Sequence, residues 1–272
     1  DEANWLFGNV SAFIIQSDRL PIYYKYAGEL IKKSAAYICT CDNEKFKEWI
    51  LEKKPCPCRN LPSKEHLQRW KKMLDKKEYK EGEAILRFKS NLNLDNPALR
   101  DFPLARINES EHPRQKKKYR VWPLMNLSVT VDDIEFRTTH AIRAKEHMDN
   151  AKRQEMIMKV FGKKAPETYF LGRYKFTDLE ISCSKTKEKI KEGKFNGWGD
   201  IRLPFIAALR KRGYQPEAFA KMAEQRGLSE VDKVLAQEDY FTLLDNINRE
   251  LLRDKVRKLE FSEKKQDGQK EF

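Results

Sequence analysis

The sequence has 272 residues, of which 55 are Lys or Arg and 42 are Asp or Glu, so its formal net charge at pH 7 is +13. This length suffices for one large domain, or two to three small ones, with an apolar core. A hydrophobic share of 40% excludes a disordered polyelectrolyte, and no apolar run approaches the ~18 residues that a membrane span needs. No charged-then-apolar leader opens the chain, so we expect a soluble, cytoplasmic protein. The positive charge favours a nucleic-acid partner, although a role in solubility alone is the alternative.

The first 36 residues predict a short buried strand and then a helix. Residues 12–15, Ala-Phe-Ile-Ile, form the apolar run of the strand. Ser17 and Asp18 offer an N-cap for the helix, and Pro21 falls in the first turn, where proline is tolerated. Apolar side chains then recur at helical spacing as far as about Lys33: Leu20, Tyr23, Ala27, Leu30 and Ile31.

Residues 37–118 are more polar, and they predict two helices followed by a strand. The helices are expected at 44–52 and 63–76, and the strand at 83–89. The stretch 90–118 is rich in Asn, Pro and charge, so we expect it to be a loop. It ends in a basic run at 114–118, which is typical of a solvated surface and would also attract a phosphate backbone.

The second half of the chain predicts three strands and then helices. The strands are expected at 119–123, 127–131 and 139–142, followed by a helix at 145–161. Residues 200–252 have the pattern of helices alone, with breaks at 213–216 and at Gly227. The polar tail, 263–272, is expected to fray.

Four of the five cysteines form two close pairs, Cys39-Thr40-Cys41 and Cys56-Pro57-Cys58. Four thiolates satisfy the tetrahedral coordination of Zn²⁺, and two cysteines close in sequence allow one turn to deliver two ligands. We therefore expect a structural zinc site formed by Cys39, Cys41, Cys56 and Cys58. The pattern provides no open coordination position, so catalytic zinc is not expected. The alternative is a group of reduced, buried cysteines, which the polar neighbours disfavour.

Three sets of motifs occur in a fixed order between residues 5 and 252. The first set lies at 15–24 and 36–41, the second at 119–124, 132–133 and 139–147, and the third at 172–173, 182–187 and 197–203. Together they resemble the catalytic core of archaeal-type glutamyl-tRNA synthetases, which are close relatives of glutaminyl-tRNA synthetases.

The resemblance implies an α/β fold with a partial class I nucleotide-binding (Rossmann-like) core. Residues 1–36 and 119–181 would form this core. Residues 37–118 would be an inserted α/β domain that binds the tRNA acceptor end and carries the zinc site. Residues 182–272 would contain the ATP loop and a helical region that contacts the tRNA stem.

The resemblance also implies an activity, the ATP-dependent ligation of glutamate to tRNA. The expected partners are tRNA, glutamate and ATP with Mg²⁺; no membrane partner is expected, and the sequence does not indicate the oligomeric state. Two alternatives remain open. One is a non-catalytic, zinc-stabilised tRNA-binding module derived from a synthetase, and the other is a glutaminyl-tRNA synthetase.

The segment 182–186, Ser-Cys-Ser-Lys-Thr, resembles the Lys-Met-Ser-Lys-Ser loop of the family. A mobile lysine with hydroxyl neighbours can stabilise the negative charge that develops on the departing pyrophosphate. The resemblance therefore implies that Lys185 is catalytic and that Ser184, Thr186 and Arg173 help it to bind ATP. The alternative is an ordinary surface tripeptide without such a role.

Arg143 stands where glutamyl enzymes of the family tend to have arginine and glutaminyl enzymes have cysteine. A guanidinium pairs with a carboxylate through two parallel hydrogen bonds, whereas an amide offers it one acceptor. The resemblance thus implies that Arg143, Met125 and Asn126 bind the amino acid and that glutamate is preferred. Met125 departs from the pattern because many relatives have tyrosine there. An ordinary arginine at the end of a strand is the alternative reading of Arg143.

For tRNA, the resemblance implies contacts by Arg87, Trp198, Asp200 and Arg202. Gly199 replaces an aspartate of the family's Gly-Trp-Asp-Asp motif, which weakens one polar contact that the resemblance implies near the acceptor stem.

The other ATP motif of the family resembles His-Ile-Gly-His, and none of the four histidines stands in such a setting. We expect that motif to lie upstream of Trp5. We accordingly expect that this polypeptide alone does not catalyse glutamate-dependent ATP–pyrophosphate exchange, because both ATP motifs must be in place at once.

Overall fold

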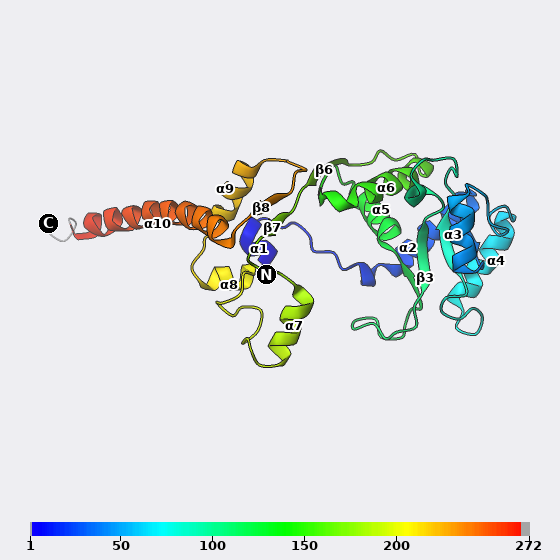
Figure 1. Ribbon diagram of the computed structural model, residues 1–272, viewed down its shortest axis with the longest axis horizontal. Helices are drawn as coiled ribbons and strands as arrows, with labels where there is room; N and C mark the ends of the chain where they lie inside the picture. The colour runs from blue at the N-terminus through cyan, green and yellow to red at the C-terminus, as the bar shows by residue number, and fades with distance from the viewer. Residues whose placement is uncertain (1, 268–272) are drawn as a thin grey trace. The chain divides into compact units, whose positions relative to one another are not determined.

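The computed structural model describes residues 2–267, and the chain divides into two compact units (Figure 1). One unit is Ile14–Phe170; the other combines the described residues of Asp1–Phe13 and Leu171–Phe272. The four domain roles that the resemblance implies are a finer division, and they stay predictions.

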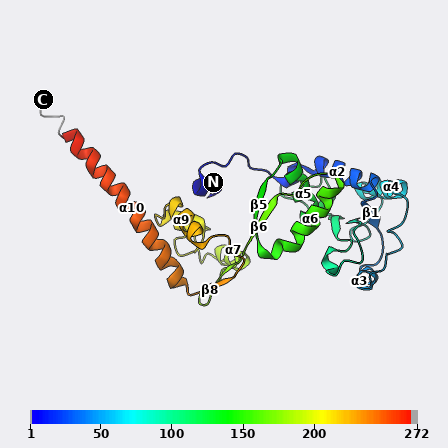
Figure 2. The ribbon, with the colours of Figure 1, turned by 90° about the horizontal axis from the view of Figure 1, so that it is seen from above.

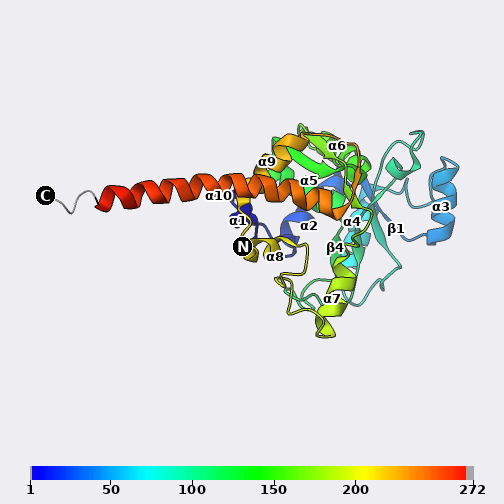
Figure 3. The same cartoon turned by 60° about the vertical axis from the view of Figure 1, so that its left-hand side comes forward.

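The unit that contains both ends of the chain is mainly helical. Strands β7 and β8 pair in parallel, Tyr174 opposite Lys233, and α9 packs against α10. Figures 2 and 3 show α9 beside the first turns of α10, whose later turns extend beyond α9. Its elements, in chain order, are α1 (Glu2–Phe7), β7 (Tyr174–Phe176), α7 (Cys183–Lys191), α8 (Ile206–Lys211), α9 (Pro216–Arg226), β8 (Lys233–Leu235) and α10 (Gln237–Asp267).

The unit Ile14–Phe170 contains a four-stranded antiparallel sheet in the order β1-β2-β3-β4, and β5 pairs with β6 in a separate two-stranded sheet. Its elements are η1 (Gln16–Asp18), α2 (Leu20–Lys32), β1 (Ala36–Cys39), α3 (Asn43–Leu51), α4 (Ser63–Leu74), β2 (Ile85–Phe88), η2 (Pro97–Leu99), β3 (Pro103–Ile107), β4 (Val121–Pro123), α5 (Met125–Phe136), β5 (His140–Ala144), η3 (Lys145–His147), α6 (Met148–Val160) and β6 (Glu167–Leu171).

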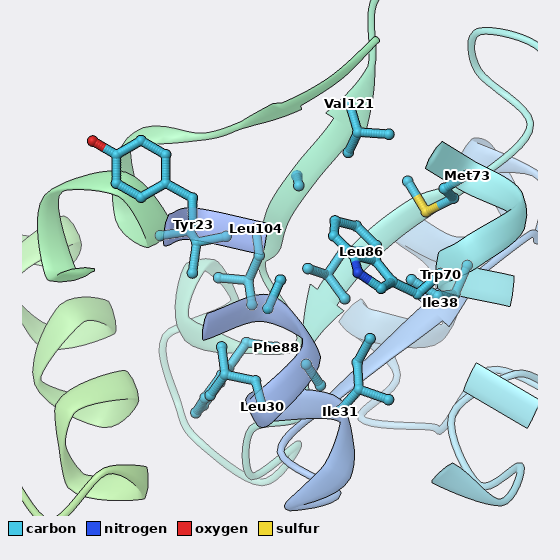
Figure 4. Close-up of a cluster of buried hydrophobic side chains, with 14 of the residues drawn as sticks. Tyr23, Leu30, Ile31, Ile38, Trp70, Met73, Leu86, Phe88, Leu104 and Val121 are labelled. Carbon is cyan, nitrogen blue, oxygen red and sulfur yellow. The ribbon is translucent and has the colours of Figure 1, made fainter. Parts of the chain in front are cut away.

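The main core lies where α2 and α4 pack on the four-stranded sheet (Figure 4). Helix α2 presents apolar side chains at a spacing of three to four residues, so they form one face that the sheet covers. Apolar burial of this kind is the chief favourable term in folding. The buried side chains in Figure 4 include Tyr23, Leu30 and Ile31 of α2, Trp70 and Met73 of α4, and Ile38, Leu86, Phe88, Leu104 and Val121 of the strands.

The elements expected from the sequence are confirmed to within a few residues for α2, α3, α4, β2, β4, β5 and α6. The strand expected at 127–131 is wrong, because this segment lies inside helix α5. Of its three apolar residues, Leu127 and Val131 are four apart, which is helical spacing, and are buried, whereas Val129 between them is only partly buried.

Three further expectations are also wrong. Residues 12–15 form no strand, and Phe13 is 84% exposed. The stretch 90–118 is not only loop, because it contains β3 between β2 and β4. Residues 200–252 are not wholly helical, because they contain the short strand β8, which pairs with β7.

The polar tail, 263–272, lies partly outside the described residues; α10 continues to Asp267. Among residues 2–267, no helix combines the length and the apolar character that crossing a membrane requires.

Leu104 is fully buried in β3, so Leu104→Ala should lower the free energy of unfolding by about 2–5 kcal/mol through lost burial and a residual cavity. Urea unfolding followed by circular dichroism measures this change. Leu51→Ala is the control, because Leu51 is 67% exposed and its truncation should cost less than about 0.5 kcal/mol. Equal effects of the two substitutions would show that β3 does not belong to the core.

Candidate functional site

Arg143 on β5 is held by two helices. Its NH2 group lies 3.3 Å from Oδ2 of Asp133 on α5, and its NH1 group donates a hydrogen bond to Oε1 of Gln154 on α6. The Arg143 side chain is only 15% exposed. Burial raises the pKa of the Asp133 carboxyl, and a hydrogen bond from Thr138 and the charge of Arg143 oppose this rise. The guanidinium therefore has a defined orientation, and it has more N–H donors than these two bonds use.

Asp132, the neighbour of Asp133 on α5, holds a different set of partners. Its carboxylate accepts hydrogen bonds from Arg19 Nε at 2.8 Å, from the Tyr23 hydroxyl at 2.8 and 2.9 Å, and from Gln16 Nε2 at 3.0 Å. Burial and this carboxylate raise the pKa of the Tyr23 hydroxyl well above its usual value. Asp132 thus fixes the segment 16–23 against α5.

The other two residues predicted to bind the amino acid, Met125 and Asn126, begin α5. Met125 is 41% exposed, whereas Asn126 is 7% exposed and its Oδ1 has no hydrogen-bond partner among the described residues. They precede Asp133 by seven to eight residues, which is about 12 Å along the helix axis. Their role stays a prediction, and Asn126 offers a buried acceptor.

Lys185 lies in the first turn of helix α7, together with Ser184 and Thr186, so the loop expected at these residues begins a helix instead. The Ser182 hydroxyl caps this helix by accepting from the Lys185 backbone N–H at 3.4 Å. The Lys185 ammonium forms an ion pair with Glu180, which raises the pKa of the lysine and lowers that of the glutamate. Both side chains are exposed, so the pair adds little stability and the ammonium can exchange Glu180 for another anion.

Gly172 and Arg173 lie at a tight crossing of two segments. A Cβ on Gly172 would lie 2.3 Å from the carbonyl oxygen of Val231, so no other residue fits there without a shift of the backbone. Arg226 donates to the Gly172 carbonyl oxygen, and its guanidinium carbon lies 4.1 Å from the centroid of the Tyr174 ring. Arg173 itself is exposed, and its backbone N–H donates to Asp232 at 3.0 Å.

Of the residues predicted to contact tRNA, Trp198 and Arg202 are exposed and Asp200 is buried. The Asp200 carboxylate accepts from Arg202 Nε at 2.9 Å and from the backbone N–H groups of Asn196 and Arg202 at 3.0 and 3.1 Å. These hydrogen bonds hold the pKa of Asp200 below its usual range. Asp200 therefore shapes the turn, whereas Trp198 and Arg202 face outward.

Arg87, the fourth residue predicted to contact tRNA, is 6% exposed in β2. Its guanidinium carbon lies 3.4 Å from the centroid of the Phe46 ring on α3. In this structure the side chain therefore packs in the interior rather than on the surface.

The four predicted zinc ligands converge. Cys39 Sγ lies 3.9 Å from Cys56 Sγ, and Cys41 Sγ lies 3.6 Å from Cys58 Sγ. The sulfurs of Cys39, Cys41 and Cys56 all lie within 4.8 Å of one another. A Zn–S distance of about 2.3 Å places the sulfurs of a tetrahedron about 3.8 Å apart. Three of the sulfurs thus lie close enough to share one ion, and Cys58 is the fourth thiol, next to Cys41.

Cys58 has two polar neighbours besides the other sulfurs. Arg69 NH1 on α4 donates to its Sγ at 3.4 Å, and Thr40 Oγ1 lies 3.5 Å away. Hydrogen bonds to Cys58 lower the pKa of its thiol, whereas burial and the neighbouring sulfurs raise the pKa of Cys41 to about 11. Arg69 and Thr40 therefore stabilise negative charge on Cys58.

A buried carboxylate, Asp101, supports the cysteine cluster from the side of the sheet. It accepts from the Tyr37 hydroxyl at 2.8 Å, from Arg59 Nε at 2.7 Å and from the Ser90 backbone N–H at 2.9 Å. Tyr37 precedes Cys39 on β1, and Arg59 follows Cys58. The backbone of Asp101 has a φ of +36°, which is unfavourable for a residue with a side chain. Asp101 therefore holds one residue next to each cysteine pair, Tyr37 before Cys39 and Arg59 after Cys58.

Comparison with known proteins decides the family. Residues 1–252 match the family model described as tRNA synthetases class I (E and Q), catalytic domain. The chain belongs to this family. The match confirms the resemblance derived from the motifs and the α/β class I catalytic-domain fold that it implied.

The chain is 46% identical over 253 residues to the glutamate–tRNA ligase of Pyrococcus horikoshii. The match covers 93% of this chain and 44% of that protein. It is 40% identical over 261 residues to the glutamate–tRNA ligase of Methanothermobacter marburgensis, covering 96% and 46%. The chain thus spans less than half the length of these synthetases. A solved glutamate tRNA ligase from Elizabethkingia meningosepticum matches 81% of this chain and 48% of its own, with a TM-score of 0.47 and 22% identity.

Sequence reasoning missed two residues of these sites, Gln154 and Arg69. Gln154 is a polar residue on the buried face of α6, beside Ile157 and Met158, and a polar residue in such a position requires a partner. That signal was present in the sequence, although it does not identify the partner. Nothing in the spacing of Arg69 points to Cys58.

The imidazole of His66 is buried on α4, and its Nδ1 accepts from the Ile38 backbone N–H on β1 at 3.2 Å. Burial lowers the pKa of His66 below its usual value, so the folded state favours the neutral imidazole. The stability that it contributes is present above the pKa of the unfolded state and is lost as the pH falls. We expect the free energy of unfolding to fall between pH 7 and pH 5, and His66→Gln to remove part of that slope.

Urea unfolding at both pH values measures the slope. His140→Gln is the control because the His140 side chain is 64% exposed, so this variant should keep the slope of the unmutated protein. An unchanged slope in His66→Gln would contradict the assignment.

Proposed function

We propose that the protein carrying this chain ligates glutamate to tRNA at the expense of ATP. The observation that carries the proposal is the oriented guanidinium of Arg143, in a chain whose curated relatives are named glutamate–tRNA ligases. A guanidinium held by Asp133 and Gln154 binds a carboxylate with two parallel hydrogen bonds and discriminates against a side-chain amide. Glutamate is therefore favoured over glutamine.

The reaction consists of two transfers. The α-carboxylate of glutamate attacks the α-phosphorus of ATP, so that pyrophosphate leaves and glutamyl adenylate forms. A hydroxyl of the terminal adenosine of tRNA then displaces AMP. Negative charge grows on the departing pyrophosphate in the first step, and a lysine ammonium stabilises such charge without a change of protonation. Lys185 supplies the positive charge, since its ammonium is exposed and can reach an anion, and Ser184, Thr186 and Arg173 are further residues that bind ATP.

For tRNA, the exposed Trp198 and Arg202 are the proposed contacts. An indole face stacks on bases and a guanidinium pairs with phosphates. Arg202 lies with its guanidinium carbon 5.0 Å from the centroid of the Phe195 ring, and its bonds to Asp200 fix its position. Asp200 acts through Arg202, and Arg87 would have to leave the Phe46 ring to reach RNA. The net charge of +13 supports binding that weakens as salt rises.

The zinc site is the structural part of the proposal. Cys39, Cys41, Cys56 and Cys58 would hold the ion, and their spacing fits a tetrahedron. Bound zinc would join β1 to the loop after α3 and would play no part in the chemistry at ATP.

We expect purified protein to contain about one equivalent of zinc and Cys56→Ser to contain far less, because the serine hydroxyl is a poor replacement for a thiolate ligand. Mass spectrometry of the metal after dialysis measures the content. Cys183→Ser is the matched control, because Cys183 is exposed on α7 outside the cluster. Full zinc content in Cys56→Ser, or none in the unmutated protein, would refute the site.

The proposed activity is tested by glutamate-dependent ATP–pyrophosphate exchange in the protein as its gene encodes it. Lys185→Ala should lower kcat about 100-fold, because the charge on the departing pyrophosphate is then unmatched. Lys189→Ala, on the same helix, is the control and should retain activity. Binding of tRNA without any exchange in the unmutated protein would instead favour a non-catalytic tRNA-binding module, and exchange with glutamine alone would favour a glutaminyl enzyme.

A further inference from the structure

We propose that Gln154 is the positioning residue that sets the orientation of the Arg143 guanidinium and thereby the affinity for the side chain of the amino-acid substrate. This inference rests on the proposed function. It concerns a residue of α6 that belongs to none of the motifs by which the family was recognised in the sequence.

The geometry around Arg143 gives Gln154 this role. Arg143 NH1 donates to Gln154 Oε1, and Arg143 NH2 lies 3.3 Å from Asp133 Oδ2. The two acceptors lie on different helices, α6 and α5, so they fix the plane of the guanidinium from two directions. Asp133 alone would leave the group free to rotate about a single contact.

The burial of Gln154 makes its hold on Arg143 firm. The residue is 3% exposed and is followed on α6 by the buried residues Ile157 and Met158. Since a guanidinium can only donate, the amide oxygen must face Arg143 and the amide nitrogen must face away from that bond. The hydrogen bond from Arg143 therefore determines which way the Gln154 amide group faces.

The amide nitrogen of Gln154 adds a second observation. Within residues 2–267, Nε2 is buried and has no hydrogen-bond partner. A buried donor without an acceptor costs stability and calls for an explanation at each site where it occurs. The packing of α6 thus holds Gln154 in place although its amide nitrogen is unpaired, which fits a side chain whose role is to accept from Arg143.

The neutral side chain at this position also matters for charge. Asp133 already offsets part of the positive charge of Arg143. A second carboxylate in place of Gln154 would over-compensate the guanidinium and would repel the incoming carboxylate. Glutamine orients Arg143 and leaves its charge available to the ligand.

The test compares three variants of the protein as its gene encodes it, in glutamate-dependent ATP–pyrophosphate exchange. Gln154→Met keeps the length of the side chain and removes both amide groups, so KM for glutamate should rise about tenfold or more while KM for ATP stays unchanged. Gln154→Glu should raise KM for glutamate at least as much. Glu155→Gln, on the exposed side of α6, is the matched control and should not change either constant.

Thermal unfolding separates positioning from a loss of folding. Gln154→Met should change Tm little, because the loss of the acceptor for Arg143 is offset by the removal of a buried donor that has no partner. A KM for glutamate within twofold of the unmutated value overturns the inference, and so does a rise in both KM values together with a fall in Tm. The absence of glutamate-dependent exchange in the unmutated protein overturns the proposed function itself, and the inference with it.

Discussion

Two adjacent carboxylates connect α5 to the segment 16–23, which is distant in the sequence, and to β5, the strand that follows α5. Successive residues of a helix point about 100° apart, so neighbours on the chain contact different elements. Asp132 binds Arg19 and Tyr23, near the start of the unit Ile14–Phe170, and Asp133 binds Arg143 on β5. The orientation of Arg143 depends on this arrangement. Helix α5 carries Asp133, one of the two acceptors of the Arg143 guanidinium, and Asp132 holds α5 in place.

Charged and polar side chains also surround the cysteine cluster beside the four-stranded sheet. Arg69 and Thr40 lie beside Cys58, and the Tyr37 hydroxyl, which donates to Asp101, lies beside Cys56. Hydrogen bonds from such neighbours orient ligating sulfurs and stabilise their charge. The positions of these sulfurs therefore depend on neighbouring polar side chains as well as on the cysteines themselves.

Amphipathic periodicity and motifs made much of this molecule predictable. Helices α2 and α4 were expected because their apolar residues recur at helical spacing, and Arg143 and Lys185 because their motifs stand in the family order. Residues 127–131 were misread as a strand because five residues are too few to separate the two periods. Strand β3 was missed because Pro and polar residues surround it, and its place between β2 and β4 is decided by distant pairing. The Gln154–Arg143 bond depends on how α6 packs, which no spacing encodes.

Asp101 places two demands on one position. Its left-handed backbone suits glycine, whereas Tyr37 needs a hydrogen-bond acceptor there and Arg59 needs a counter-ion. Glycine would relax the main chain and abandon both partners; asparagine would tolerate the conformation and leave Arg59 without its counter-ion. No single replacement of Asp101 meets both demands. A change at this position is therefore tolerated only together with changes at Tyr37 or Arg59.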